Sequence, residues 1–458
     1  MRRALLFAGL WWVWLALPAQ AALLWRFDAT LADDLRTLEV SACSAGAVSE
    51  AVFSVAAAGA EALLSARRSS ARPLVRDAQR LVAADWRQGE CLHTRIDLSL
   101  LARQDRYRLG GREDRFWRSA PRLWLWRPAR IDADSTIGFR LPKGWSVSVP
   151  WRPLPDGRHR LGATPADWPA SVVIGRFEEV RLPRPGGVLR VSVVPTADAV
   201  PVAALTEWIG QVADDLLHSH ARMPLPDVQV LVVPLPSVRS AVPWGQVTRG
   251  GGSAIHLFPG LEAGPSAWRN DWTATHEFAH LLHPFLGDRG RWLGEGLASY
   301  YQNVLRARSG QLSQTQAWDK LIAGFERGRA ATPEDADSLS SVAVQRRRGS
   351  TMRVYWAGAA FWLERDLDLR RAGSSLDEAL ARFAAQHLPA ERRWHPEDFV
   401  AELDRLTPAG RWVESYRRFA GSRQFPALPP ALARWSDGAQ PSAEMSAVMQ
   451  ATKQFSQR

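Results

Sequence analysis

Lysine is almost absent from this chain: Lys143, Lys320 and Lys453 are the only three among 458 residues. The net charge is nevertheless +11, so arginine carries nearly all of the positive charge, and it is spread along the whole sequence. A protein that binds nucleic acid gathers its basic residues around an organised recognition element. The composition therefore argues against a nucleic-acid partner. We interpret the densest run, Arg346–Arg348, as a solvated loop; the alternative is a contact for acidic substrate groups or anionic envelope polymers.

Long hydrophobic segments are missing beyond the first residues. The chain opens Met1-Arg2-Arg3, is apolar from Ala4 to Leu17, and then has Ala19-Gln20-Ala21, a small-residue cleavage pattern. These features are typical of a secretory signal peptide, which we predict for residues 1–21. The apolar part is shorter than the roughly 20 residues that cross a membrane. We therefore expect a periplasmic or secreted protein with no stable membrane span after cleavage; an uncleaved anchor is the alternative.

Cysteine is also rare, and Cys43 and Cys91 are the only two. An even number of cysteines in a chain bound for an oxidising compartment predicts one disulfide, in the amino-terminal region. The alternative is a pair of buried free thiols. Neither cysteine lies near the histidine-rich segment described next, so neither is a candidate metal ligand.

The most informative segment is His276-Glu277-Phe278-Ala279-His280. Residues four apart lie on one face of a helix, so both imidazoles can reach a single ion. Glu295 follows fifteen residues after His280, early in a second predicted helix that a glycine-containing turn would fold back against the first. Two histidines and one carboxylate leave a fourth position open on a tetrahedral zinc ion, which is typical of catalytic sites.

Such a site supplies hydrolytic chemistry. Zinc lowers the pKa of its bound water from 15.7 to roughly 7 and polarises a carbonyl group. Glu277, which is not needed to bind the ion, is the natural general base for the attacking water. The alternative is a surface helix with two solvated histidines. His283 lies only three residues beyond His280, and we expect packing or a hydrogen bond for it rather than ligation.

Three segments together resemble a known group of enzymes. They are His276–His280, Glu295–Tyr301 and Tyr355–Gly358, and they are similar to the gluzincin metallopeptidases, most of all to the glycyl aminopeptidase family, over roughly residues 95–385. The resemblance implies a thermolysin-like catalytic domain with Zn²⁺ bound by two histidines and the later glutamate. It also implies that Tyr355, in a Y-x-x-G segment, helps to hold the oxyanion. From the residues alone, Tyr355 is equally a core aromatic.

The sequence departs from this family before the zinc helix. Related aminopeptidases carry a G-x-M-E-N-like edge strand whose glutamate holds the substrate's amino group, whereas the corresponding segment here, Gly250–Phe258, has no acidic residue. This leaves endopeptidase and aminopeptidase activity unresolved. If the segment is an edge strand, it can pair with an extended peptide, and we predict substrate contacts from Gly252 and His256. A simple turn and a solvated histidine are the alternatives.

The periodicity predicts an α+β protein of several domains. Short alternating strands indicate a β-sandwich over residues 22–195, and a mixed helix and strand pattern indicates the catalytic domain over 196–310. Helices dominate residues 311–425, and 426–458 form a tail with partial disorder. Paired tryptophans such as Trp124 and Trp126 favour core packing over sugar binding.

Two functional hypotheses remain. The first is an exported zinc-dependent peptidase, with a peptide or protein as its substrate. The second is a non-catalytic envelope protein that binds peptides or acts as a scaffold on a metallopeptidase-like fold. The complete set of chemical groups favours the enzyme. The oligomeric state is not predicted by the sequence.

Overall fold

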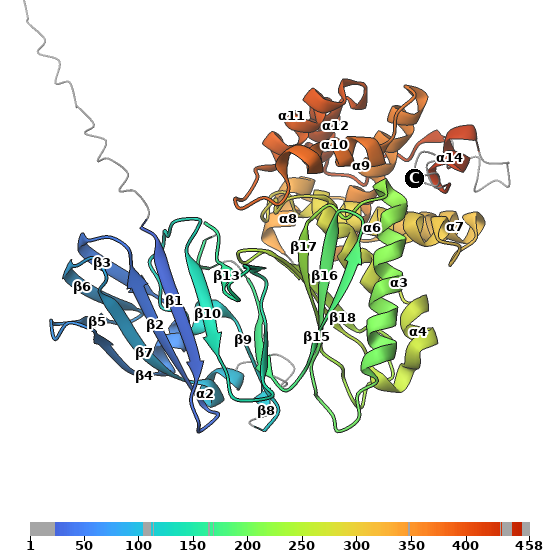
Figure 1. Ribbon diagram of the computed structural model, residues 1–458. Helices are drawn as coiled ribbons and strands as arrows, with labels where there is room; N and C mark the ends of the chain where they lie inside the picture. Colours follow the sequence, from blue (N-terminus) through green and yellow to red (C-terminus); the bar gives the residue numbers. More distant parts are fainter. Residues whose placement is uncertain are drawn as a thin grey trace, which may run out of the picture.

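The computed structural model describes residues 23–103, 111–112, 114–163, 165–167, 169–346, 349–430, 432 and 442–450. It confirms the predicted α+β class, with β-sheets in the amino-terminal part followed by a helical catalytic part (Figure 1). The predicted signal peptide, residues 1–21, lies outside the described residues. Within the described part of the chain, no helix is long and apolar enough to cross a membrane.

The amino-terminal part is built around two sheets that enclose one core. Trp25, Phe53 and Trp86 lie at its centre, with ring centroids 5.2 to 5.7 Å apart. A disulfide joins Cys43 to Cys91, which face each other on neighbouring strands. The larger sheet has, in spatial order, β12 (Arg152–Pro153), β13 (His159–Arg160), β10 (Thr136–Arg140), β1 (Trp25–Leu31), β2 (Thr37–Ser44), β7 (Cys91–Asp97) and β4 (Leu63–Arg68). The smaller sheet has β3 (Val48–Ser54), β6 (Arg80–Trp86) and β5 (Val75–Asp77).

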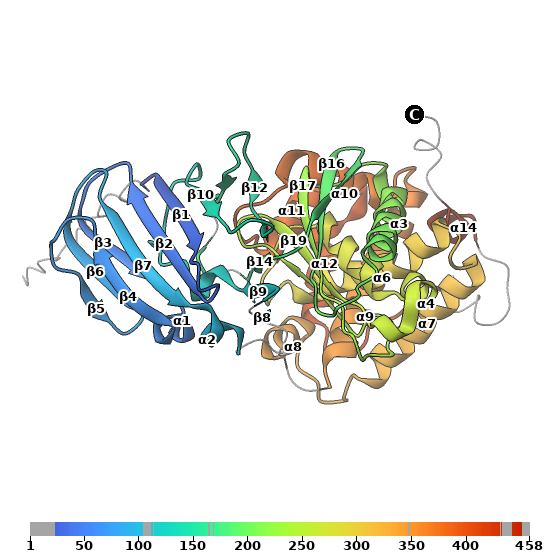
Figure 2. The same cartoon turned by 60° about the horizontal axis from the view of Figure 1, so that its bottom comes forward.

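A third, four-stranded sheet lies between this sandwich and the catalytic part (Figure 2). Its Phe116 and Val173 share a small hydrophobic cluster with Leu231 and Phe258 of the next sheet. Its strands are β11 (Ser146–Ser148), β14 (Val172–Gly175), β9 (Phe116–Ser119) and β8 (Gly111–Arg112), and the short helices of this half are α1 (Ala57–Glu61), α2 (Leu98–Ala102) and η1 (Pro121–Leu123). Trp124 and Trp126 are each 1% exposed, so they pack in the core as the sequence favours.

The catalytic part begins with a five-stranded sheet. In spatial order it contains β15 (Glu179–Arg184), β16 (Gly187–Val193), β17 (Asp227–Val232), β19 (Ser253–Phe258) and β18 (Trp244–Thr248). Because β16 pairs in parallel with β17, the strands just before residue 195 belong to this sheet. We therefore propose to move the boundary between the two halves from residue 195 to a point before β15.

One edge strand of this sheet is β18, and the other is β15. β19 lies between β17 and β18 and is hydrogen-bonded on both sides, so the prediction of an edge strand at Ser253–Phe258 is wrong. The reason is visible in its residues, because Ile255 and Leu257 pack on the helical side while Phe258 packs on the opposite side. A strand that is buried on both faces belongs in the interior of a sheet.

Helices cover one face of this five-stranded sheet and form the rest of the carboxy-terminal half (Figures 1 and 2). One hydrophobic core takes its buried residues from both sides of the predicted boundary at residue 310, between Leu189 and Met449. Part of the predicted tail also packs there, since Met445 and Val448 are buried. The helices are α3 (Val202–His220), η2 (Leu261–Ala263), α4 (Gly264–Asn270), α5 (Thr273–Ala279), η3 (His280–Leu282), α6 (Arg291–Arg308), α7 (Gln314–Ala330), α8 (Leu339–Gln345), α9 (Thr351–Arg371), α10 (Leu376–His387), α11 (Pro396–Leu406), η4 (Pro408–Gly410), α12 (Trp412–Gly421) and α14 (Ala443–Val448).

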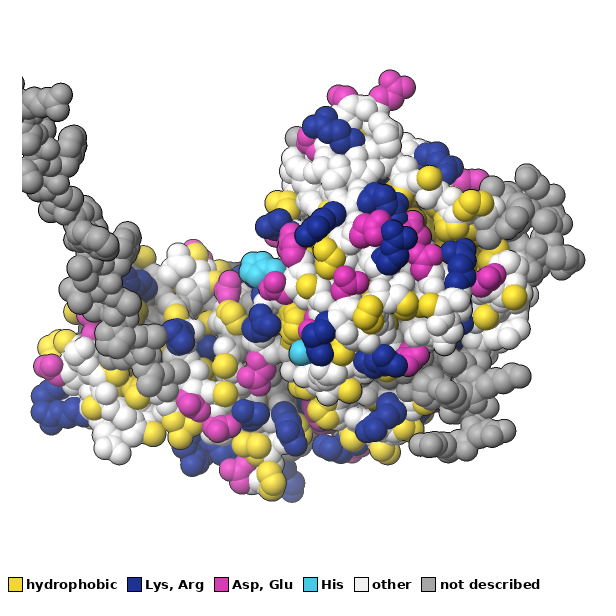
Figure 3. Space-filling model, turned by 90° about the horizontal axis from the view of Figure 1, so that it is seen from above, with side chains coloured by type: hydrophobic (Ala, Val, Ile, Leu, Met, Phe, Trp, Pro, Cys, Tyr) yellow, Lys and Arg dark blue, Asp and Glu magenta, His cyan; other side chains and the backbone are white. Residues whose placement is uncertain are grey.

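The surface carries mixed charge. On the face seen in Figure 3, arginine and lysine side chains are scattered among acidic ones and do not form a continuous basic stripe.

Helices α6 and α9 cross at two glycines, and this crossing positions the candidate site. A Cβ atom on Gly296 would lie 2.3 Å from the carbonyl carbon of Gly358, and one on Gly358 would lie 1.9 Å from the carbonyl oxygen of Trp292. Only glycine allows the two backbones to approach so closely. Tyr300 of α6 also donates a hydrogen bond to the buried Asp366 of α9, at 2.7 Å.

We expect Gly358→Ala to destabilise the protein by about 1–3 kcal/mol, since the added methyl group must push α9 away from α6. Urea unfolding of the full chain measures this loss. Gly421→Ala is a matched control, because a Cβ there meets no atom within 4 Å. Equal unfolding midpoints for the two variants would show that the crossing tolerates a side chain.

Candidate metal centre

The two histidines of the candidate site lie where one helix changes into a tighter turn. His276 is in α5, and His280 begins the 3₁₀ turn η3. The carboxylate of Asp271 accepts a hydrogen bond from the backbone N–H of Thr273 at 2.7 Å, which satisfies a free donor at the helix start. The predicted helical spacing therefore holds as far as His280, and the chain then leaves the helix before Pro284.

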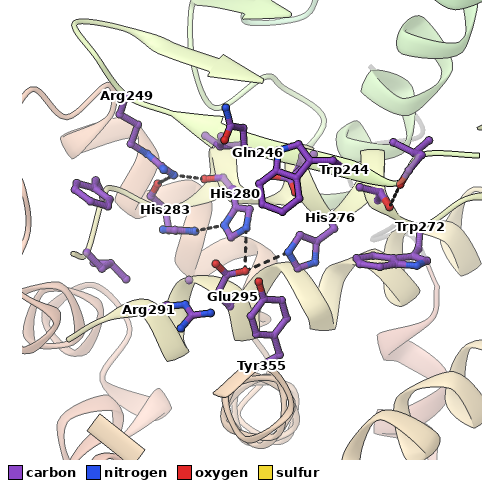
Figure 4. A pocket seen from close by; sticks show the side chains of 18 of the residues that line it. Trp244, Gln246, Arg249, Trp272, His276, His280, His283, Arg291, Glu295 and Tyr355 are labelled. Atoms are coloured by element: carbon purple, nitrogen blue, oxygen red, sulfur yellow. Dashed lines mark hydrogen bonds and ion pairs between the residues drawn. The ribbon is translucent and has the colours of Figure 1, made fainter. Parts of the chain in front are cut away.

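The structure brings His276, His280 and Glu295 together (Figure 4). One carboxylate oxygen of Glu295, on α6, lies 3.4 Å from Nε2 of His276 and 3.6 Å from Nε2 of His280. All three ligand atoms lie within 4.8 Å of one another. Two imidazole nitrogens and one carboxylate oxygen converging in this way are a donor set that suits a divalent zinc ion.

The second nitrogen of each imidazole has a hydrogen-bond acceptor. Nδ1 of His276 donates to Oε1 of Gln302 at 2.8 Å. Nδ1 of His283 lies 2.7 Å from the carbonyl oxygen of Pro284 and donates to it, because a carbonyl oxygen can only accept. Nε2 of His283 therefore carries no hydrogen and accepts from Nδ1 of His280 at 3.0 Å. Burial holds the pKa of His283 well below its usual value, which keeps this imidazole neutral. Both ligand histidines are thereby fixed with Nε2 directed at the site.

The sequence missed one of these supporting residues. The two aspartates nearest in sequence make other contacts, since Asp271 accepts from the backbone N–H of Thr273 and Asp288 pairs with Arg346. Gln302 is the actual partner of His276, and it lies seven residues after Glu295, on the same face of α6. That spacing is a usable signal once the ligand on α6 is known.

The general-base candidate, Glu277, lies beside the ligands and is buried. Burial raises the pKa of its carboxyl to about 7, and the nearby carboxylate of Glu295 acts in the same direction. Although burial also acts to raise the pKa of Glu295, the two imidazoles hold it well below its usual range. The carboxyl of Glu277 is therefore suited to exchanging a proton near neutral pH, whereas that of Glu295 remains an anion.

Close backbone packing holds Glu277 in place. A Cβ on Gly245, in the edge strand β18, would lie 2.6 Å from Cγ of Glu277. The edge strand therefore passes directly over the glutamate, and an extended substrate paired with this strand would lie across the metal ligands.

Tyr355, at the start of α9, faces the site (Figure 4). Its ring stacks on His276, with centroids 5.8 Å apart and planes inclined by 11°. Burial, with the neighbouring carboxylate of Glu295, raises the pKa of the phenol far above its usual value, so the hydroxyl stays protonated and able to donate. The geometry is compatible with the role that the family resemblance implies for it, which stays a prediction.

Gly252 and His256, predicted to contact substrate, do not line this cleft. His256 is fully buried in the interior strand β19, and its Nδ1 lies 3.0 Å from the side-chain nitrogen of Gln246. Gly252 packs against the amino-terminal half, since a Cβ there would lie 1.8 Å from the carbonyl oxygen of Pro150. The prediction depended on an edge strand at residues 253–258, and the edge is in fact β18.

The ligands open into a cleft of about 620 Å³. Arg249 and His283 lie on one side of the ligands, and Trp272 lies on the other (Figure 4). Trp272 is 45% exposed although it is large and apolar, and its ring meets that of His276 edge to face. Trp272 and Tyr355 also line a second cavity of about 490 Å³. The cleft therefore extends beyond the ligands on both sides.

Comparison with known proteins supports the fold. No family model matches the sequence, and no curated protein sequence matches it. Among solved structures, an aminopeptidase N family protein from Idiomarina loihiensis matches with a TM-score of 0.66 at 13% identity, covering 90% of this chain and 78% of that one. An M1 zinc metallopeptidase from Deinococcus radiodurans matches with a TM-score of 0.53 at 16% identity, covering 90% and 96%.

The chain has the fold of an M1 zinc metallopeptidase. A further structure of the Deinococcus radiodurans enzyme, a mutant described as bound to a Tyr-Ser-Ala substrate, matches with a TM-score of 0.52 at 15% identity. Such low identity establishes the fold alone. The gluzincin resemblance seen in the sequence is thus supported, and the finer resemblance to the glycyl aminopeptidase family stays a prediction.

We expect Gln302→Leu to weaken zinc binding about 10–100-fold, because His276 loses the acceptor that orients its ring. Competition with a chromophoric chelator measures the affinity. Gln211→Leu, at a half-buried position of α3 that does not line the cleft, is the control and should bind zinc like the unchanged protein. An unaltered affinity in Gln302→Leu would exclude an orienting role for the amide.

Proposed function

We propose that this protein is a zinc-dependent peptidase, with His276, His280 and Glu295 as the metal ligands and Glu277 as the general base. The observation that carries the proposal is the convergence of the three ligand atoms beside a buried glutamate at the base of an open cleft. A non-catalytic peptide-binding protein would need neither the buried glutamate nor the protonated phenol of Tyr355 in these positions.

Each group has a defined task in peptide hydrolysis. A bound zinc ion supplies a water of lowered pKa and polarises the scissile carbonyl. Glu277 accepts a proton from the attacking water and returns it to the departing amine. Tyr355 donates a hydrogen bond to the negative charge that develops on the carbonyl oxygen. The edge strand β18 aligns the substrate by backbone hydrogen bonds.

The cleft favours cleavage of internal bonds. Holding the free amino group of a substrate requires an available carboxylate. Apart from Glu277 and Glu295, the acidic residues of the cleft are Asp271, one oxygen of which accepts from the backbone N–H of Thr273, and Asp288, which pairs with Arg346. The edge strand β18 has no acidic residue. The room on both sides of the ligands also suits a chain that continues in both directions. We therefore propose an endopeptidase.

We also propose that the protein works in the periplasm or is secreted. The sequence pattern of residues 1–21 supports export, and the disulfide between Cys43 and Cys91 suits an oxidising compartment.

Glu277→Gln should lower the hydrolysis of internally quenched peptides by about 10²-fold or more, since the amide cannot accept the proton of water. The variant should still bind about one zinc ion per chain, because the ligands are unchanged. Glu326→Gln, on the exposed face of α7, serves as the control. A wild-type protein that binds zinc but cleaves no peptide in a broad library would instead favour the scaffold function.

Blocking the amino terminus of a substrate should not reduce its cleavage. We expect acetylated and free forms of the same quenched peptide to have kcat/KM values within about threefold of each other, because the edge strand β18 that would pair with the substrate has no acidic residue to hold the amine. A strict requirement for the free amine would establish an aminopeptidase.

A further inference from the structure

Arg249 brings a positive charge into the cleft immediately after the edge strand. One of its terminal nitrogens donates to two backbone carbonyl oxygens, those of His280 at 2.8 Å and His283 at 3.3 Å. These two bonds anchor the guanidinium beside the metal ligands. Burial lowers its pKa to about 10, so the group is still a cation at neutral pH.

Arg291 supplies a second positive charge from the opposite wall. It is the first residue of α6, four positions before Glu295, and its guanidinium lies 5.9 Å from the centre of the Tyr355 ring. Both arginines line the cleft. Figure 4 shows Arg249 and Arg291 away from Trp272, on the side of the ligands where His283 lies.

Neither guanidinium has an acidic partner of its own. Among the residues that the structure describes, no carboxylate oxygen lies within ion-pair distance of Arg249 or Arg291, in contrast to Arg346, which lines the same cleft and pairs with Asp288. Glu277 and Glu295 attract Arg249 from a longer range. In the function proposed above, however, those two carboxylates balance the charge of a divalent cation. The positive charges of Arg249 and Arg291 then have no negative charge left to balance them.

An uncompensated, partly buried guanidinium is costly unless an anion reaches it. Arginine offers planar N–H groups that match a carboxylate. The nitrogens of Arg249 that do not bond to His280 and His283 are available for such a contact, and so is the guanidinium of Arg291.

We propose that Arg249 and Arg291 bind a carboxylate of the substrate, so that this peptidase prefers peptides with an acidic group close to the cleaved bond. The proposal rests on the peptidase function and adds its substrate class. The carboxylate comes from an aspartate or glutamate side chain or from the carboxyl terminus of a short peptide. The same charges disfavour a free amino group at this end of the cleft.

The test uses the zinc-loaded full chain and quenched peptides that are acetylated and amidated. A single glutamate is moved through the positions around the cleaved bond, with glutamine in the same place as the reference. We expect at least one position at which glutamate raises kcat/KM about 10-fold or more over glutamine, as a charged hydrogen bond allows. A short peptide with a free carboxyl terminus, compared with its amide, distinguishes the second source of the carboxylate.

Arg291→Gln should remove most of this preference, measured as the ratio of kcat/KM for the glutamate peptide to kcat/KM for the glutamine peptide. Arg249→Lys should weaken the preference, since lysine keeps the charge but loses the planar fork. Arg289→Gln is the matched control, because Arg289 pairs with Glu397 and does not line the cleft. It should retain the full preference.

Binding to the Glu277→Gln protein separates the two proposals. Calorimetry with the glutamate and glutamine peptides measures recognition without hydrolysis, and we expect the glutamate peptide to bind about 10-fold more tightly. Equal binding of the two peptides, together with cleavage that ignores the glutamate, would overturn the carboxylate site and leave the peptidase intact. A protein that cleaves nothing but binds the glutamate peptide more tightly would contradict the peptidase and retain the carboxylate site.

Discussion

The candidate site depends on one geometric constraint, the meeting of His276 and His280 with Glu295 from a neighbouring helix. The histidines are fixed by their own spacing, but Glu295 reaches them only because α6 packs against η3 and α9. A Cβ on Gly294 would lie 2.9 Å from the ring of His283, and the crossing at Gly358 leaves no room for a side chain. Small residues on both faces of α6 therefore bring the carboxylate into place.

The same packing sets the protonation states of the side chains in the site. Glu277 lies beneath the edge strand, away from water, and its pKa rises for that reason. The phenol of Tyr355 is held on the opposite side of the ligands by α9 and stays protonated. A proton acceptor, a hydrogen-bond donor and a metal-binding set thus face one cleft from four elements, α5, η3, α6 and α9. Such convergence from elements distant in sequence is typical of a preorganised catalytic site.

The sequence alone predicted the local features well. The spacing of His276 and His280 follows from helical geometry, and the α+β class follows from the change in hydrophobic period. The disulfide between Cys43 and Cys91 also appears in the structure. These inferences depend on residues that are close in sequence or on composition.

The wrong or missing predictions concern the spatial order of strands and the contacts between residues that are far apart in the sequence. Ser253–Phe258 is an interior strand because β18, which precedes it in the chain, pairs along its outer side, and no local pattern reveals that order. His256 was consequently misplaced in the substrate cleft. Gln302 went unrecognised because its contact with His276 depends on how α6 packs against α5. Arg249 went unrecognised because its position depends on a hydrogen bond to the carbonyl oxygen of His280, just after α5. Side chains that support a site are defined by the fold rather than by a motif.

X-ray absorption spectroscopy at the zinc edge of the metal-loaded protein reports the atoms that bind the ion. We expect two imidazole nitrogens at about 2.0–2.1 Å, the remaining ligands to be oxygen atoms at a similar distance, and no sulfur ligand. A first shell that lacks imidazole nitrogen, or a protein that retains no zinc after dialysis, would contradict the proposed centre.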